Sequence, residues 1–260
     1  MQDNSTNEMR KPLLFVLLIW ASFAFAQKRG EELRGQAADK VFKGASLVWQ
    51  KQSNLIPSFI ELRQGQDEES FLAGLKSQFQ LPGSYSFTLS SADADQIGWL
   101  HKRYNLTVNG VPLVNGNIVL HIKNDRVLKY NGYVFKSINA PSTASISEAD
   151  ALTAALADVG ATSYKWQIPA EEKFIKTEQH NAQATFYPKG ALCVLQLGGY
   201  ESSNFKLAYK FDVYAHEPME RYDVYVDAET GVVLQKLSHI CTAHEQGTAL
   251  TGFSGVRSIN

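Results

Sequence analysis

The feature that most constrains the fold of this 260-residue chain is an alternation of apolar and polar side chains, interrupted by dipeptides that favour tight turns. From Gly98 to Val108 the apolar side chains share one face, which is the period of a strand with one buried side. Asn109-Gly110 and then Asn115-Gly116 follow, and both residue types tolerate positive φ. We therefore expect a small antiparallel sheet over about 98–135, with a turn at 123–126 and a bend at Asn131-Gly132.

A second set of period-two segments indicates another sheet, over 191–197, 205–213, 221–227 and 232–237. Each predicted sheet is preceded by a predicted helix. The first spans 68–79 on its apolar spacing, and the second begins after Ser147 as N-cap and stops at Gly160. The pattern predicts an α+β fold of two small domains, each a helix packed on an antiparallel sheet.

The N-terminus has the pattern of a secretory signal peptide. Arg10 and Lys11 precede an apolar stretch from Leu13 to Phe25, and Ala24-Phe25-Ala26 forms a small-x-small cleavage site. The alternative is an uncleaved anchor, although the stretch is shorter than the roughly 20 residues of a membrane span. Residues 27 to about 44 are polar and charged without a clear period and are expected to form a helix or a loose leader, within a leader segment that spans 27–67.

The composition argues against several function classes. A formal net charge of −1 gives no electrostatic support for a nucleic-acid partner. A second apolar run is absent, so no membrane association is expected after signal cleavage. Two cysteines, Cys193 and Cys241, could pair in an oxidising compartment or remain isolated thiols, and the sequence leaves both open.

Metal and catalytic sites are not expected in this chain. His216-Glu217 and His244-Glu245 each lack the second histidine of HExxH, and Pro218 would break the required helix. His101 and His121 lie on strands, but a shared metal site lacks an evident third ligand. A nucleophile elbow and a supported cysteine nucleophile are also lacking, so we predict no catalytic, metal or cofactor residues.

The segment 103–113, Arg-Tyr-Asn-Leu-Thr-Val-Asn-Gly-Val-Pro-Leu, resembles the core motif of fungalysin/thermolysin propeptide (FTP) domains. The residues that carry this likeness are Arg103, Tyr104, Gly110, Pro112, Gly116 and His121. Three positions depart from the family pattern, because Leu106 replaces a usual Gln, Val108 a frequent Tyr and Asn115 a frequent Gly. The Leu106 change removes any polar contact that the Gln makes.

The second half resembles a PepSY domain, through its helix start at Ile146 and the Asp227-Ala-Glu-Thr230-Gly231 turn. The tail from Gly247 looks like the first strand of a mature thermolysin-like peptidase, which implies a processing point between His239 and Gly247. That processing region also contains Cys241, Ala243 and His244. The expected organisation is a signal peptide (1–26), a leader (27–67), an FTP-like domain (68–138), a PepSY-like domain (144–240) and a processing segment with the peptidase start (241–260).

Together these resemblances imply the exported pro-region of a thermolysin-like zinc metallopeptidase. Such a pro-region would act as intramolecular chaperone and inhibitor, and its partner would be the cognate catalytic domain. Zinc and calcium would then belong to that domain and not to this chain. We expect an extracellular or periplasmic location, with 237–248 lying in the peptidase cleft by strand addition. The alternative is a free-standing exported peptidase inhibitor or binding module.

Overall fold

The computed structural model describes residues 30–51, 54–199, 202–240, 247–251 and 255–259. Seven strands belong to the first half of the chain: β1 (Glu31–Arg34), β2 (Ala45–Gln50), β3 (Phe59–Gln66), β4 (Tyr85–Ala94), β5 (Leu100–Val108), β6 (Val111–Lys123) and β7 (Arg126–Gly132). Five follow in the second half: β8 (Ser163–Tyr164), β9 (Ala191–Leu197), β10 (Asn204–Glu217), β11 (Glu220–Asp227) and β12 (Val233–Ser238). A final hairpin comprises β13 (Gly247–Thr251) and β14 (Gly255–Ile259).

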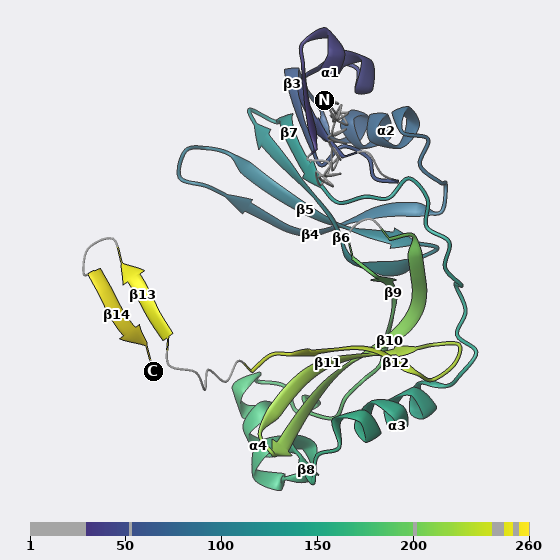
Figure 1. The fold of residues 1–260 in the computed structure, drawn as a ribbon, viewed down its shortest axis with the longest axis vertical. Helices are drawn as coiled ribbons and strands as arrows, with labels where there is room; N and C mark the ends of the chain where they lie inside the picture. Colours follow the sequence, from purple (N-terminus) through teal and green to yellow (C-terminus); the bar gives the residue numbers. More distant parts are fainter. Residues whose placement is uncertain (1–29, 52–53, 200–201, 241–246, 252–254, 260) are drawn as a thin grey trace, which may run out of the picture.

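Within the described residues, four α-helices accompany the sheet: α1 (Gln36–Val41), α2 (Glu68–Gln78), α3 (Glu148–Val159) and α4 (Pro169–Glu178). A short 3-10 turn, η1 (Lys165–Gln167), precedes α4. Figure 1 shows α2 against the first-half strands and α3 beneath the second-half strands, with the β13–β14 hairpin standing apart. The predicted helix at 68–79 and the predicted helix after Ser147 are both confirmed.

The main sheet is mixed but mostly antiparallel. Its strands follow the order β1-β2-β3-β7-β6-β9-β10-β11-β12, with β5 and β4 added on β6 and β8 on β10. The two halves meet where β6 and β9 run parallel, at the single pair Leu113 and Val194. The β13–β14 hairpin forms its own two-stranded sheet.

Each half buries a helix against strands. In the first half, Asp67 caps α2 by accepting from the backbone N of Ser70, and the helix buries Phe71 and Leu75. In the second half, Ser147 caps α3, and Gly160 ends it in the left-handed conformation at φ 64°. Helix α3 packs on β10, β11 and β12. The capping residues predicted from sequence therefore set the ends of α3.

The Asn115-Gly116 dipeptide forms a bulge, and the prediction of a second turn there is wrong. Thr107 pairs with Pro112, but Asn105 pairs with Asn117, so β6 carries four residues against one on β5 over this stretch. Asn115 still has positive φ, at 60°. The strand continues because Leu113 within the bulge pairs with β9, a contact that a local turn signal does not encode.

Residues 31–66 differ from the predicted leader. They form β1, α1, β2 and β3, and β3 pairs with β7. Strand β4 and helix α4 were also missed. Strand β4 begins with the alternation Tyr85, Phe87 and Leu89, which the prediction overlooked, although only Tyr85 is buried. Helix α4 has no buried residue and therefore lacks the apolar stripe on which helix prediction depends.

The predicted α+β class is confirmed, whereas two separate domains are not clearly shown. The main sheet runs through both halves. Val194 and Phe205, which belong to β9 and β10, pack in the apolar cluster of the first half, and the Phe205 ring meets Phe135 at 4.8 Å between centroids. The domain boundaries given above therefore stay a prediction.

Replacing Tyr130 by phenylalanine should leave stability unchanged or raise it by up to about 1 kcal/mol. The Tyr130 side chain is fully buried, and its hydroxyl has no hydrogen-bond partner within the described part of the chain. Removing a buried hydroxyl without a partner relieves its desolvation cost. Denaturant unfolding measures the change. Tyr104→Phe is the control, because that hydroxyl donates to Glu68 and its loss should destabilise. A larger loss for Tyr130→Phe than for the control would contradict the prediction.

Candidate functional site

The motif residues on β5 and β6 fall on two opposite faces of the sheet. Tyr104 is buried, and its hydroxyl donates to Glu68 at the start of α2. Lys102 Nζ lies 2.6 Å from the other oxygen of the same carboxylate. Burial raises the pKa of Tyr104, and the Glu68 carboxylate raises it further, so the phenol stays neutral. This face therefore ties the helix to the sheet and offers no reactive group.

Glu68 and Lys102 were not among the residues predicted from the sequence. Burial raises the pKa of Glu68, but the hydrogen bonds from Lys102 and Tyr104 lower it more, so the carboxylate is ionised at neutral pH. Glu68 lies 36 positions before Tyr104, and a helix start and a strand at that separation have no local pattern that links them. Only the packing of α2 on the sheet brings them together.

The other face carries the exposed motif residues. Arg103 is exposed, and it forms no ion pair with any residue in the described ranges. Pro112 is exposed next to the Asn109-Gly110 turn, where φ is 52° and 81°, as predicted. Gly116 is required by space, since a Cβ there would lie 2.5 Å from Leu113 Cδ2. Gly110 and Gly116 thus shape the hairpin, and the Arg103 side chain is exposed to solvent beside it.

His121 lies on this exposed face and is the direct cross-strand partner of His101. Their Nδ1 atoms are 2.7 Å apart. Among the residues that the structure describes, no three His, Cys, Asp or Glu side chains converge as a metal site would require. The sequence suggested the two histidines as a possible shared site but not their direct pairing, because the bulge at Asn115 sets the register that makes them neighbours.

The motif residues of the second half build one hairpin turn between β11 and β12. Asp227 is 3% exposed, and its Oδ1 accepts from the backbone N of Glu229 at 2.8 Å and of Thr230 at 3.3 Å. Lys206 Nζ lies 3.4 Å from Asp227 Oδ2, and Gly231 takes φ 75°. Burial raises the pKa of Asp227, but the two backbone N–H groups and Lys206 lower it more. These residues hold a turn and are not placed beside the β5–β6 motif.

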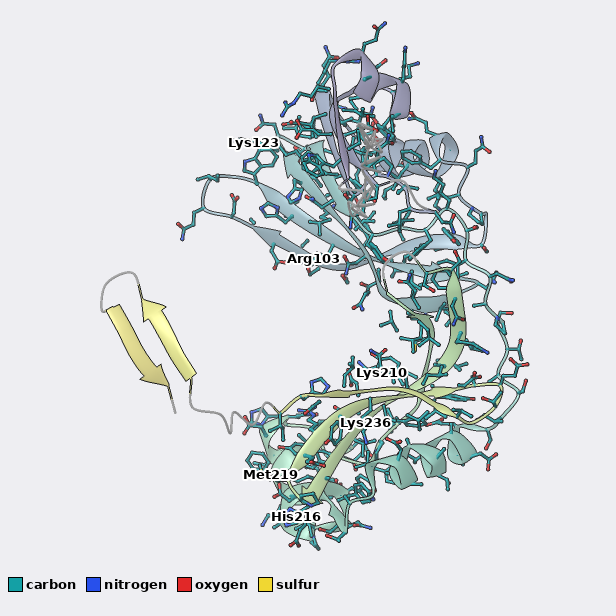
Figure 2. All side chains as sticks on the ribbon, in the orientation of Figure 1. Arg103, Lys123, Lys210, His216, Met219 and Lys236 are labelled. Carbon is teal, nitrogen blue, oxygen red and sulfur yellow. The ribbon has the colours of Figure 1, made fainter. Side chains whose placement is uncertain are left out.

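A concave pocket of about 880 Å³ lies where the β6 bulge meets β9 and the open face of β11 and β12. Leu113, Leu195, Leu234 and Leu237 give it an apolar lining. Lys210 and Asp223 place an ion pair at 2.7 Å in the same pocket. Figure 2 shows Lys210 and Arg103 on sides of the two halves that face each other.

The processing region begins beside this pocket. His239 Nε2 lies 3.2 Å from Asp223 Oδ1, and the His239 backbone N donates to Arg221 O at 2.8 Å. Leu237 and Ser238 belong to β12 and Gly247 begins β13, so the ends of the predicted 237–248 tail are strands. Cys241, Ala243 and His244 lie outside the described residues.

Cys193 is buried in β9 as a free cysteine, and its Sγ lies 3.5 Å from Ala208 O. Burial raises the pKa of its thiol to about 11, which keeps it protonated and unreactive at neutral pH. Its pairing with Cys241 stays a prediction, since Cys241 is not described. The predicted signal peptide, 1–26, also falls outside the described residues, and none of the described helices is long and apolar enough to cross a membrane.

Comparison with known proteins gives three findings. The family model described as Fungalysin/Thermolysin Propeptide Motif matches residues 85–134. Bacillolysin of Bacillus subtilis (strain 168) is 26% identical over 190 residues, covering 71% of this chain and 33% of the relative. Bacillolysin of Bacillus amyloliquefaciens is 27% identical over 161 residues, covering 60% of this chain and 28% of the relative. The chain thus spans about a third of the length of the curated relatives it matches.

Among solved structures, the Bacillus megaterium YpeB C-terminal domain matches with a TM-score of 0.33 and 12% sequence identity. The match covers 74% of this chain and 75% of that one. The propeptide motif model spans β4 to the end of β7, so it includes the two faces described above.

Proposed function

We propose that this chain is the pro-region of a secreted, bacillolysin-type metallopeptidase and that it assists folding of the catalytic domain and inhibits it. The observation that carries the proposal is the propeptide motif match over 85–134 together with the similarity to bacillolysins over 190 residues. The first half would be the FTP domain, with helix α2 on its strands, and the second half a PepSY domain, with helix α3 on its strands.

The surface chemistry supports a protein partner. The pocket between the halves combines an apolar lining with an ion pair, and Leu237 at its rim is 44% exposed. Strand β12 ends the order of the main sheet, so its outer edge is unpaired among the described residues. An unpaired edge beside an apolar surface is a site for strand addition by a partner. Binding the native catalytic domain more tightly than its unfolded form would stabilise it by mass action.

The test begins with the gene. An in-frame HExxH sequence with a distal Glu downstream of Asn260 would supply the cognate catalytic domain. That domain is unfolded in denaturant and refolded with and without this chain added in trans. We expect a severalfold higher recovery of peptidase activity with the chain, and inhibition of the native catalytic domain at micromolar chain concentration.

A heat-unfolded sample of the same chain is the matched control, because it has the same composition without the fold. Inhibition without any gain in refolding would favour the free-standing inhibitor instead. The proposal fails if the folded chain changes neither refolding nor activity.

A further inference from the structure

Two histidine rings meet edge to face on the exposed side of the first-half sheet. The Nδ1 atoms of His101 and His121 lie 2.7 Å apart, and the ring planes are inclined by 79°. Two unprotonated nitrogens at this distance would repel through their lone pairs. One Nδ1 must therefore carry a proton and donate it to the other.

The Nε2 atom of each ring also makes a polar contact. His101 Nε2 lies 3.3 Å from Asp95 Oδ2, and His121 Nε2 lies 2.8 Å from Asn131 Oδ1. Carboxylate and amide oxygens only accept, so both Nε2 atoms donate. The three contacts use three protons, whereas two neutral imidazoles carry two. The geometry therefore fits a pair that holds one extra proton, with the Asp95 carboxylate beside it.

We propose that the His101–His121 pair is a pH-sensitive latch, which holds one shared positive charge near neutral pH and opens when it takes up a second proton. A second proton would place N–H groups on both Nδ1 atoms and like charges on adjacent rings. The two rings would have to separate. The proposed latch does not depend on the proposed function.

The latch fastens the β4–β5 turn to the sheet. Asp95 lies in that turn, and its Oδ1 accepts from the backbone N of Ile97 at 3.0 Å and of Trp99 at 2.8 Å. Its Oδ2 is the oxygen that meets His101. Through His121 and Asn131 the chain of contacts continues to β6 and β7. Opening therefore releases this turn first, while the backbone pairing of β5 with β6 can persist.

Charged groups from five strands surround the pair. They are Asp93 on β4, opposite His101; Arg103 on β5; Lys123 on β6; Lys129 on β7, opposite His121; and Glu61 on β3, 3.3 Å from Lys129. Lys123 and Lys129 also lie over the ring of Trp99. The acidic groups Asp93 and Asp95 are thus on the His101 side, and the cation directly across from His121 is Lys129.

This distribution places the carboxylates beside His101 and opposes a positive charge on His121. Burial lowers the pKa of His121, and the hydrogen bond to Asn131 opposes this. The charges of His101, Lys129 and Arg103 lower it further. A histidine with a lowered pKa binds a proton more readily when unfolded, so its contribution to stability is present above about pH 6.5 and is lost as the pH falls.

The first test counts protons directly. Long-range 1H–15N spectra of the purified chain at pH 7, in the presence of EDTA, report the protonation of each ring nitrogen. We expect three N–H protons over the four nitrogens of His101 and His121, and two coupled titration steps on acidification. Two outcomes would overturn the proposal: only two N–H protons on the two rings at pH 7, or two rings that titrate independently of each other at the ordinary pKa of histidine.

The second test follows opening. Hydrogen exchange of the 92–101 segment, corrected for intrinsic rates, should be severalfold faster at pH 5 than at pH 7, because the contact between the two rings holds this turn to the sheet. His121→Asn places a non-titrating acceptor near Nδ1 and should remove this dependence. His180→Asn, an exposed histidine at positive φ after α4, is the matched control and should retain it. Equal pH dependence in His121→Asn and the unchanged chain would refute the latch.

Discussion

Replacing Phe135 by alanine should lower the free energy of unfolding by about 3–5 kcal/mol. Phe135 is 1% exposed, and its ring meets Phe205 of β10 edge to face, at 4.8 Å and 81°. Truncation would remove a buried aromatic ring and leave a cavity at the place where the two halves share their core. A cavity of this kind costs more than the lost transfer free energy, because the surroundings relax only partly.

Denaturant unfolding followed by far-UV circular dichroism and by intrinsic fluorescence measures the effect. Phe174→Ala on α4 is the control, since that side chain is 57% exposed and its loss should change stability by less than about 0.5 kcal/mol. Because Phe135 and Phe205 join the halves, we expect one cooperative transition that shifts as a whole. Two separate transitions, with only one moved by the substitution, would show instead that the halves unfold as independent domains.

Replacing Asp227 by alanine should destabilise the chain by about 3 kcal/mol. The substitution leaves the backbone N–H groups of Glu229 and Thr230 without their acceptor, in a turn whose aspartate is 3% exposed. It also removes the partner of Lys206. Thermal or denaturant unfolding at pH 7 measures this change in the free energy of unfolding. A loss below about 1 kcal/mol would mean that the turn holds without the carboxylate.

Asp227→Asn separates the two contributions. The amide oxygen can still accept from the turn, but the charge beside Lys206 is gone, so a smaller loss is expected. Because the pKa of Asp227 is lowered in the folded state, its ionic contribution is present above the ordinary value of 3.8 and is lost as the pH falls through the lowered value. The difference between the unchanged chain and Asp227→Asn should therefore shrink between pH 5 and pH 2. A difference that does not change with pH would exclude the ionic contribution.

Features set by neighbouring residues could be predicted from the sequence. The Asn109-Gly110 turn needs two residues that tolerate positive φ, and helix α3 needs a hydroxyl at Ser147 and a glycine at 160. Strands β9 to β12 were also predicted, because apolar runs and alternation are strong where one face is buried, whereas the two-residue strand β8 was missed. The motif resemblance over 103–113 fell within the region that the propeptide model matches.

Features set by distant partners could not be predicted. The place of β3 in the sheet could not be predicted, because it pairs with β7, more than sixty residues later in the chain for the pair of Ile60 with Tyr130. Glu68 meets Tyr104 only because α2 packs on the sheet. Helix α4 carries no buried residue, so its sequence has no apolar stripe from which the helix could be predicted.

The bulge at Asn115-Gly116 depends both on local residue preferences and on tertiary contacts. The residue types determined that the backbone bends there, since Asn115 takes positive φ and Gly116 has no room for a Cβ. Whether the bend became a turn or a bulge was decided by the pairing of Leu113 with Val194. The three extra residues shift the register, which puts Ile118 and Leu120 in the core and sets His121 opposite His101. Sequence alone therefore determined the turns, the caps and the alternation, which are local preferences of φ and burial. Tertiary structure decided register and long-range neighbours, because these depend on the total burial of the whole sheet.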